Sequence, residues 1–470
     1  MKLILAFTLI FAASLALFFP SLNYYFFQDD WFVLNWVQTG DLASFLSFRT
    51  DIIYWRPISM PLLFFTAKNL FDLNPLGYHL IAFSIFFALI FAVYKLFLLL
   101  GFDRKLSFAA SFMYGVWPIH FISLSWFSTT SYIIGPFFQV TSFIFFIKFI
   151  ENRRKLFGIM SFAVFLLGIG SSEFTLVLPA IFLAWGFLIK KTIYLKPLLP
   201  YLITDIIYIF IRSYVFPLPT AGDYQPFLNK QIINNFIWYI AWALGFPENF
   251  KTLIFPTLIN QSVEIVTKFW TITFPSFLLI LVFIRQFLIT KRRYLKSYLF
   301  GAVWFSIGLT PVITITNHSF PMYLSFSGIG FLYIIITSLK NSPLIIQVAF
   351  FCLWFITSFA NLQFTRTSHW IKNEQAVSKA YVDFTNKVIP NPPSGSIFYF
   401  KPADVEFAVR HHFFLVETES TLKQSLSDQN AMQAIYGDPT LQSFYSSHQN
   451  ELNFSRDLIL FEIYPKKTDY

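Results

Sequence analysis

The sequence predicts an all-α polytopic membrane protein with a small α/β domain at its C-terminal end. Of 470 residues, 56% are hydrophobic and only 12% are charged, about half the charged fraction of a soluble domain. Many apolar runs also reach the roughly 20 residues that a helix needs to cross a bilayer. From residue 361 onward the apolar runs shorten and polar residues increase, which predicts a separate domain.

The basic residues set the expected orientation. The net charge is +10, but the lysines and arginines lie in short loops between apolar runs, which is the positive-inside pattern rather than a nucleic-acid patch. Placing the clusters at 104–105, 153–155, 190–196 and 291–296 in the cytoplasm puts all of them on one side. We therefore expect a multi-pass protein of the plasma (inner) membrane with its N-terminus cytoplasmic, its C-terminus extracytoplasmic and no nucleic-acid partner.

About eleven transmembrane helices are expected. The first follows Lys2 and is taken as uncleaved, because no convincing small-residue cleavage site comes after it. The apolar runs predict the others, and the number of helices between basic clusters is the one that keeps all of these clusters on the same side of the membrane. The expected helices cover about residues 3–19, 79–100, 106–122, 132–150, the two flanks of 170–173, 198–216, 269–289, 298–315, 322–339 and 344–359.

The remaining segments form two long outer loops and the tail. The loops are expected at about 20–78 and 217–268, and residues 232–246 of the second predict an interfacial rather than a spanning helix. The transmembrane domain is placed at 1–361 and the extracytoplasmic α/β domain at 362–470. Within the tail, the patterns predict an amphipathic helix at 368–389 and strands at 396–400 and 457–463.

The adjacent Asp29 and Asp30 are the central candidates for chemistry. A charge beside a membrane is costly unless it is solvated or used, so the pair is either an ordinary acidic loop or a catalytic carboxylate at the outer face. In sugar transfer from a lipid-linked phosphosugar the leaving phosphate is already acidic, and one carboxylate suffices as the base. Two adjacent acids do not make the opposed pair of a glycoside hydrolase. The second acid would bind the acceptor, a basic side chain or a divalent cation.

Other polar residues near the predicted outer face are candidates for binding substrate. Arg56 is a candidate for the leaving phosphate, with snorkelling to lipid headgroups as the alternative. Glu173 lies in a predicted outer turn, where carboxylates are functional by default, although a helix-start role is open. His79, His120 and His318 lie near predicted outer helix ends, where a polar cap is the alternative for each.

Five segments, in order along the chain, carry a family resemblance. They are Gln-Asp-Asp-Trp at 28–31, Tyr-Trp-Arg-Pro-Ile at 54–58 with Asn-Pro-Leu-Gly-Tyr-His at 74–79, Ser-Glu-Phe-Thr-Leu-Val-Leu-Pro at 172–179, Tyr-Leu-Ser-Phe-Ser-Gly-Ile-Gly at 323–330, and Thr-Arg-Thr-Ser-His-Trp at 365–370. The ordered set resembles the GT-C superfamily of polytopic glycosyltransferases. It is most similar to protein O-mannosyltransferases and to bacterial relatives of the TPR-containing O-mannosyltransferases.

The resemblance implies a GT-C-like fold and an inverting transfer of a mannose-like monosaccharide from a polyprenyl-phosphate donor to an acceptor hydroxyl outside the cytoplasm. It places the catalytic base in the acidic pair, with Asp29 preferred slightly over Asp30. Substrate contacts are expected from Trp55 and from the polar candidates named above: Arg56, Glu173, His79 and His318. No cofactor is assigned, and a divalent cation at the acidic pair stays open.

Two departures from the family pattern leave the substrates open. Residues 320–323 read Phe-Pro-Met-Tyr, where the family has an arginine before the tyrosine, and the tail has no TPR repeats. The acceptor is therefore a protein, a glycan or a lipid headgroup, in contact with membrane lipids around the protein. The alternative function is a polytopic transporter or a lipid or glycan flippase. The acidic residues gather at the outer face rather than at mid-membrane, and no internal repeat is found, which favours the enzyme.

Overall fold

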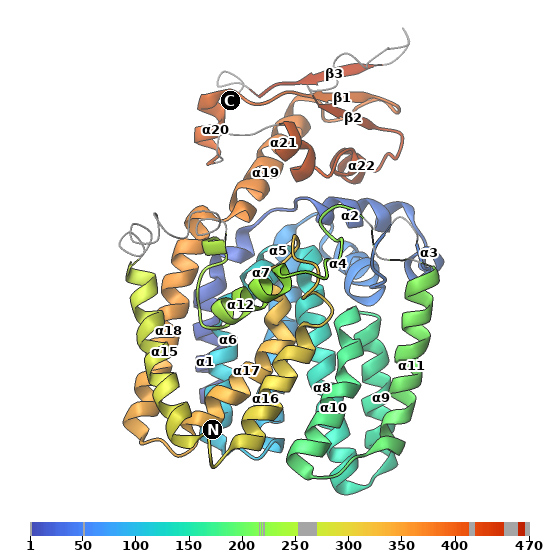
Figure 1. Cartoon of the computed structure of the whole chain (residues 1–470). Coiled ribbons are helices and arrows are strands. Elements are labelled where there is room, and N and C mark those ends of the chain that lie inside the picture. Colours follow the sequence, from blue (N-terminus) through green and yellow to red (C-terminus); the bar gives the residue numbers. More distant parts are fainter. Residues whose placement is uncertain are drawn as a thin grey trace.

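Helices form a bundle, and a small domain sits on one end of it (Figure 1). The computed structural model describes residues 2–49, 52–215, 217, 219, 221–251, 270–412, 419–445 and 459–465. The N-terminus lies at the end of the bundle opposite the C-terminal domain (Figure 1). We call the end that carries the domain the tail end, and the opposite end the basic end.

Each of the eleven apolar segments predicted from the sequence contains a helix of the bundle. By length and composition, seven helical segments in the described part of the chain are long and apolar enough to cross a membrane, and the full number of spans stays a prediction. The bundle consists of α1 (Lys2–Phe18), α5 (Pro75–Leu99), α6 (Arg104–Gly115), α8 (Ser131–Asn152), α9 (Lys155–Ile169), α10 (Leu178–Trp185) with η6 (Gly186–Lys190), α11 (Leu195–Tyr214), α15 (Trp270–Thr290), α16 (Leu295–Leu309), α17 (Leu324–Leu339) and α18 (Leu344–Ser368).

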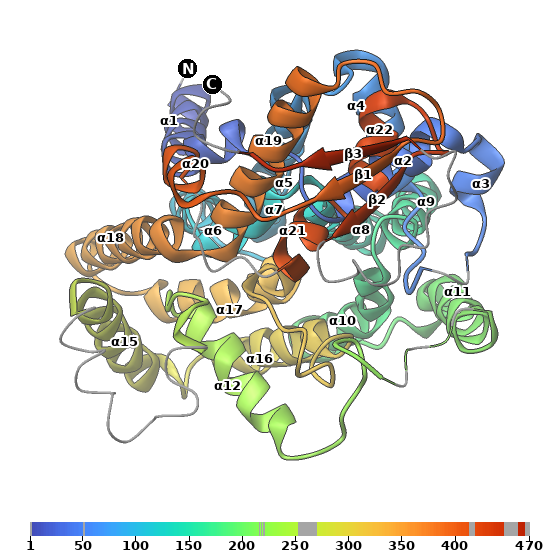
Figure 2. The ribbon, with the colours of Figure 1, turned by 90° about the horizontal axis from the view of Figure 1, so that it is seen from above.

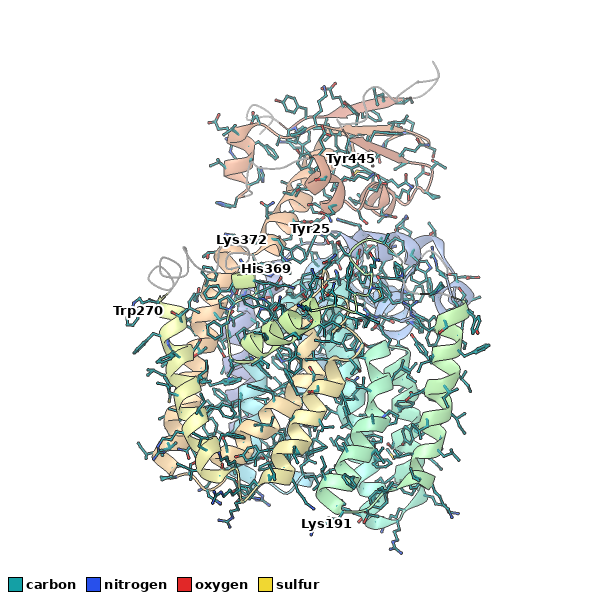
Figure 3. All side chains as sticks on the ribbon, viewed as in Figure 1. Tyr25, Lys191, Trp270, His369, Lys372 and Tyr445 are labelled. Carbon is teal, nitrogen blue, oxygen red and sulfur yellow. The ribbon has the colours of Figure 1, made fainter. Side chains whose placement is uncertain are left out.

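Local signals start and stop these helices. Asn74 caps α5 by accepting a hydrogen bond from the Leu76 N–H (3.2 Å), and Asp103 caps α6 in the same way from the Leu106 N–H (2.8 Å), as short polar side chains do at helix starts. The turns that join α5 to α6, α8 to α9 and α15 to α16 gather at the basic end, where Lys191 is labelled in Figure 3. The basic clusters therefore share one end of the bundle, as the charge pattern predicted.

Short elements cover the tail end of the bundle. The helix α12 lies across this end rather than through the bundle (Figures 1 and 2), as an interfacial helix would. The elements are η1 (Phe19–Asn23), α2 (Asp29–Thr39), α3 (Leu42–Leu46), η2 (Ile58–Leu62), α4 (Leu63–Phe71), η3 (Pro118–His120), α7 (Phe121–Ser125), η4 (Phe127–Thr130), η5 (Glu173–Val177), α12 (Gln231–Ala243) and η7 (Pro321–Tyr323).

The C-terminal domain is built on a three-stranded parallel sheet in the order β2-β1-β3. The central strand places Phe398 between Ser443 of β2 and Phe461 of β3. The helix α19 leads from the bundle into this domain (Figure 1). The elements are α19 (Trp370–Val388), β1 (Ile397–Phe400), α20 (Val405–Arg410), α21 (Glu419–Ser425), α22 (Asn430–Tyr436), β2 (Gln442–Tyr445) and β3 (Leu460–Ile463).

The domain shares a hydrophobic core with the tail end of the bundle. One cluster of buried side chains joins Trp31 of α2 and Phe64 of α4 to Val377 of α19 and Phe398 of β1. The Trp31 indole N–H also donates a hydrogen bond to the Ser378 hydroxyl (2.8 Å). The domain is therefore packed onto the helix that begins with the acidic pair.

Several boundaries differ from the sequence-based expectations. The acidic pair lies in the first turn of a helix, α2, rather than in a loop. The helix α6 ends at Gly115, short of the expected residue 122. The helix α18 continues to Ser368 because Leu362 and Thr365 are still buried, so the expected domain boundary at 361 lies inside it. Residues 252–268 of the second loop and 457–458 of the last predicted strand lie outside the described residues.

Candidate functional site

The acidic pair begins α2, where unpaired backbone N–H groups and the helix dipole favour carboxylates. The preceding Gln28 has φ 49° and ψ −124°, a left-handed conformation that costs energy for any residue but glycine. Two contacts from the tail domain hold it: the Gln28 backbone N–H donates to the Ser425 carbonyl (3.1 Å), and its side-chain amide donates to Glu374 (2.6 Å). The domain thus fixes the backbone from which Asp29 projects.

Asp30 is a buried anchor. The residue is only 1% exposed. Its Oδ1 accepts hydrogen bonds from both the backbone N–H (2.8 Å) and the hydroxyl (2.6 Å) of Ser128, in η4. Burial raises the pKa of Asp30 to about 7, although the hydrogen bonds from Ser128 oppose this rise. These contacts tie α2 to η4 and leave the Asp30 carboxyl turned into the protein.

Asp29 has a different environment one residue earlier. It is partly exposed, and within the described part of the chain no group donates a hydrogen bond to its carboxyl. Burial raises the pKa of Asp29 to about 6, and the positive charge of Arg56 counteracts the rise. The negative charge of Asp29 in turn raises the pKa of the Tyr54 and Tyr224 hydroxyls, beyond the larger effect of their own burial. Asp29 is therefore the accessible carboxylate of the pair.

Arg56 and Glu173 form a two-pronged ion pair beside Asp29. The Arg56 Nε donates to one Glu173 oxygen (2.7 Å) and an η nitrogen donates to the other (2.5 Å). The same guanidinium donates to the Ser131 hydroxyl (3.2 Å) and the Tyr132 hydroxyl (3.0 Å). The Arg56 side chain is 7% exposed and that of Glu173 is 27% exposed. This geometry is the strong form of an arginine–carboxylate contact.

The chain segments around the ion pair hold it in place. The Ile58 N–H donates to the Gly170 carbonyl (2.9 Å), and the Ser59 hydroxyl donates to the Ser171 carbonyl (2.6 Å). These bonds dock the segment after Arg56 onto the hairpin that carries Glu173. Two sequence segments that lie 117 residues apart therefore meet at one point of the tail end.

A cavity of about 560 Å³ opens beside the ion pair. We call it the arginine cavity. Among the described lining residues, Arg56, Glu173 and Arg212 supply the charged groups, and two arginines against one glutamate leave a single net positive charge. The cavity is lined by Ile53, Tyr54, Arg56, Tyr132, Glu173, Phe174, Leu176, Val177, Ala180, Tyr208, Ile209, Arg212, Tyr224, Ile307, Thr310, Pro311, Val312, Ile315 and Tyr323.

Away from its charged end, the arginine cavity has apolar walls. Leu176, Ile209 and Ile307 line it from η5, α11 and α16. The helix α11 stands at the edge of the bundle (Figure 2), and it exposes large apolar side chains such as Ile206 and Phe210, as a lipid-facing helix does. The cavity therefore combines a charged end with an apolar wall next to an apolar surface.

All five segments of the family resemblance meet at the tail end. The Tyr323 ring packs against the rings of Tyr132 (5.0 Å between centroids) and Phe174 (5.5 Å), next to the ion pair. The Trp370 ring lies 6.2 Å from the ring of Phe27, two residues before Asp29. Segments spread over most of the chain thus surround the acidic pair. Figure 3 shows Tyr25, His369 and Lys372 near this junction of bundle and domain.

Two predicted binding residues have other environments. His79 is buried, and its ring nitrogens lie 3.0 Å and 3.1 Å from the Leu124 and Tyr24 carbonyl oxygens; it does not line the arginine cavity. The Trp55 indole N–H donates to the Leu46 carbonyl (3.0 Å), and its ring also lies outside that lining. We therefore do not carry His79 and Trp55 into the site.

His318 and His120 have different environments in the structure. The His318 ring stacks beside the Tyr224 ring at 4.1 Å, at the border of the arginine cavity, and burial lowers the pKa of His318 to about 4. His318 is therefore neutral at neutral pH and does not replace the missing family arginine as a cation. His120 is fully buried between Phe86 and Tyr114, so it belongs to the core of the bundle and is not the expected polar cap at a helix end.

The acidic pair does not form a metal site with the side chains around it. Among the described residues, no group of three or more His, Cys, Asp or Glu side chains could hold a metal ion. Asp30 already accepts two hydrogen bonds from Ser128 on one oxygen. The described residues thus offer no site that would hold a cation by protein side chains alone, and no step below uses a cation.

Sequence reasoning missed Ser128, Tyr132, Tyr224 and Arg212. Ser128 lies in a polar run, Ser-Thr-Thr-Ser at 128–131, that the parity of the basic loops could have placed at the outer face. Arg212 is an arginine near the predicted outer end of an apolar helix, a position that predicts function. Tyr132 and Tyr224 carry no comparable signal, because aromatic residues are abundant throughout this chain.

Comparisons with known proteins leave the family open. No family model matches the chain, and no curated protein matches it. Among solved structures, the chain is similar to a crystal structure of the oligosaccharyltransferase of Archaeoglobus fulgidus in complex with Zn and sulfate, with 14% sequence identity and a TM-score of 0.49. The match covers 89% of this chain and 61% of that chain, so the chain spans less than two thirds of it. What the described residues establish is a mostly helical protein with apolar helices long enough to cross a membrane and a small parallel sheet.

Proposed function

We propose that the protein is an inverting membrane glycosyltransferase that moves a mannose-like monosaccharide from a polyprenyl-phosphate donor to an acceptor hydroxyl at the tail end of the bundle, on the extracytoplasmic side. The observation that carries the proposal is the position of Asp29. It is a partly exposed carboxylate without a hydrogen-bond donor among the described residues, and it is coupled electrostatically to Arg56 at the charged end of the arginine cavity.

The donor fits the arginine cavity by its two chemical parts. Its phosphodiester carries one negative charge and matches the net single positive charge of Arg56, Glu173 and Arg212. Its polyprenyl chain is apolar and matches the wall formed by Leu176 and Ile307, since burying apolar surface is favourable. The Arg56–Glu173 pair holds the Arg56 guanidinium in one orientation, so we assign it to fixing the charged end rather than to a free phosphate ligand.

Asp29 acts as the general base. The acceptor hydroxyl gives its proton to the Asp29 carboxylate while its oxygen forms a bond to the anomeric carbon of the donor sugar. The bond from that carbon to the phosphate oxygen breaks, and its electron pair leaves with the polyprenyl phosphate. The phosphate needs no proton to leave, so one carboxylate is enough. Asp30 does not touch the reactants and holds the start of α2 through Ser128.

The transfer assay compares two isosteric variants. The full-length protein in lipid vesicles is supplied with radiolabelled polyprenyl-phosphate mannose and with cell-surface polymer from cells that lack the protein. Asp29→Asn removes the base, and we expect transfer to fall by about a hundredfold or more, the typical effect of losing a general base. Asp30→Asn is the matched control, because the amide keeps an oxygen for Ser128 and transfer should largely persist.

Two outcomes would contradict the proposal. Full transfer by Asp29→Asn would remove the base. Movement of the labelled lipid between the leaflets of the vesicle, without sugar transfer by the wild-type protein, would instead support the flippase alternative. Thermal unfolding of both variants, measured in the same vesicles, checks that the fold is intact.

A further inference from the structure

A second cavity, of about 700 Å³, lies beside α12. We call it the amide cavity, because side-chain amides dominate its polar lining. Gln231, Asn234 and Asn235 face it from α12, and Asn249 and Asn317 face it from the adjoining loops. One turn away on α12, Ile233 and Ile237 are exposed instead. The helix therefore turns one polar edge to the cavity and one apolar edge away from it.

Asn235 brings an unsatisfied polar group to this cavity. The residue is 2% exposed, and its amide nitrogen donates to the Ile313 carbonyl (3.1 Å). Among the described residues, its amide oxygen has no hydrogen-bond partner. A buried acceptor without a partner is costly, so its position in a cavity wall indicates a ligand that donates a hydrogen bond there.

The only acidic side chain in the described lining, Glu248, is fixed by its neighbour. The His369 Nδ1 accepts a hydrogen bond from the Ile371 N–H (3.3 Å), so its Nε2 carries the proton and donates to Glu248 (3.0 Å). This bond orients the Glu248 carboxylate at the cavity wall. Lys251, which hydrogen bonds the Ser319 hydroxyl, balances its charge.

Aromatic rings complete the lining. Trp238, Phe320 and Trp370 lie in the same wall, so the cavity offers flat apolar faces between groups that both donate and accept hydrogen bonds. A pyranose presents that same combination, with hydroxyls around its rim and C–H groups on its faces. An anionic headgroup would call for an excess of positive charge, and a peptide that adds to a sheet would need a free strand edge. The strands described here are in the tail domain.

Packed aromatic rings connect the two cavities. Trp370 packs on Phe27 (6.2 Å) and beside Phe320 (6.4 Å). Phe320 packs against His318 (4.8 Å), which stacks on Tyr224 of the arginine cavity (4.1 Å). Asp29 follows Phe27 by two residues and shares its electrostatic environment with Tyr224. A row of packed rings therefore links the amide cavity both to the segment that carries Asp29 and to the arginine cavity.

We propose that the amide cavity binds a carbohydrate, and that the acceptor of the transfer is a glycan. The second part rests on the proposed glycosyltransferase function, while the first is a binding property that can be measured without turnover.

Binding is measured on the full-length protein by saturation-transfer NMR. The protein is kept in lipid nanodiscs, because maltoside detergents would themselves present a sugar. The probes are mannotriose, maltotriose and cellotriose, together with a Ser/Thr-rich peptide. We expect at least one trisaccharide to bind and its Kd to rise about tenfold in Asn234→Ala and in Asn235→Leu, the effect of losing one hydrogen bond. Ile233→Ala, on the exposed edge of the same helix, should bind as the wild type does.

Asn234 is exposed, so its variant keeps the test valid if Asn235→Leu fails to fold. Absence of trisaccharide binding, or binding unchanged in both cavity variants, overturns the inference. Binding of the peptide alone, lost in the same variants, would assign the cavity to a protein acceptor and also overturns it. If no trisaccharide binds but transfer still depends on Asp29, the proposed glycosyltransferase function holds and the sugar-binding inference is wrong. If a trisaccharide binds but Asp29→Asn retains full transfer, the sugar-binding inference holds and the proposed role of Asp29 is wrong.

Discussion

The arginine cavity and the amide cavity differ in every property that decides what they bind. The first has a net positive charge at one end and apolar walls of Leu176, Ile209 and Ile307. The second has amides, a single fixed carboxylate and aromatic faces. One suits an amphiphile with an anionic head, and the other suits a neutral polyhydroxyl compound. Two unlike cavities are what a transferase needs, since it must hold two different substrates.

The adjacent aspartates repeat this division on a smaller scale. Asp30 accepts hydrogen bonds from Ser128 and maintains the fold. Asp29 has no hydrogen-bond donor within the described residues, and its carboxylate interacts electrostatically with Arg56 of the arginine cavity. The strained Gln28, held by Ser425 and Glu374 of the tail domain, separates the two roles. The tail domain is therefore part of the catalytic architecture in our account, because it fixes the turn from which Asp29 projects.

The largest effect on this comparison is expected from breaking the ion pair. Arg56→Ala leaves Glu173 without its partner, and losing one member of a buried pair costs about 3–5 kcal/mol. We expect a lower thermal unfolding midpoint, weaker donor binding and unchanged trisaccharide binding in the amide cavity. The double variant Arg56→Ala with Glu173→Ala should recover part of the stability, because no charge is left alone. Equal loss of binding in both cavities would mean that the ion pair only supports the fold.

A smaller effect should separate the two cavities in kinetics. Arg212→Gln lowers the positive charge of the arginine cavity, and we expect the KM for the donor to rise about tenfold, a loss of about 1.4 kcal/mol, with the acceptor KM unchanged. Asn234→Ala should give the opposite pattern. Initial rates measured against each substrate in turn distinguish the two. The comparison fails if either variant changes both KM values equally.

The sequence predicted the local features of this protein better than its long-range contacts. Apolar runs and basic loops located the eleven bundle helices, and the amphipathic pattern at 368–389 matches α19 (Trp370–Val388), because these signals lie within single segments. The partners of Asp30 and Arg56 are 98 and 117 residues away. No local pattern carries such pairings, so the contacts of Asp30 with Ser128 and of Arg56 with Glu173 were not predicted.

The same limit explains the binding residues that were set aside. His79 and Trp55 stand at predicted outer positions as His318 does, and their sequence context is similar. Only the fold shows that two carbonyl oxygens surround the His79 ring and that Trp55 donates to Leu46. The amide cavity was equally hidden, since Asn234, Asn235 and Glu248 become neighbours only when α12 lies across the bundle.

The pH dependence of a single turnover tests the role of Asp29 most directly. A base must be ionised, and the pKa of Asp29 is about 6, so the rate should fall about tenfold for each pH unit below that value and level off above it. Asp30, with a pKa of about 7, titrates nearby, and the two variants separate them. We expect this acidic limb to persist in Asp30→Asn and to vanish in the residual rate of Asp29→Asn. A rate that does not change across pH 6 in the wild type, or a limb that survives Asp29→Asn, would contradict it.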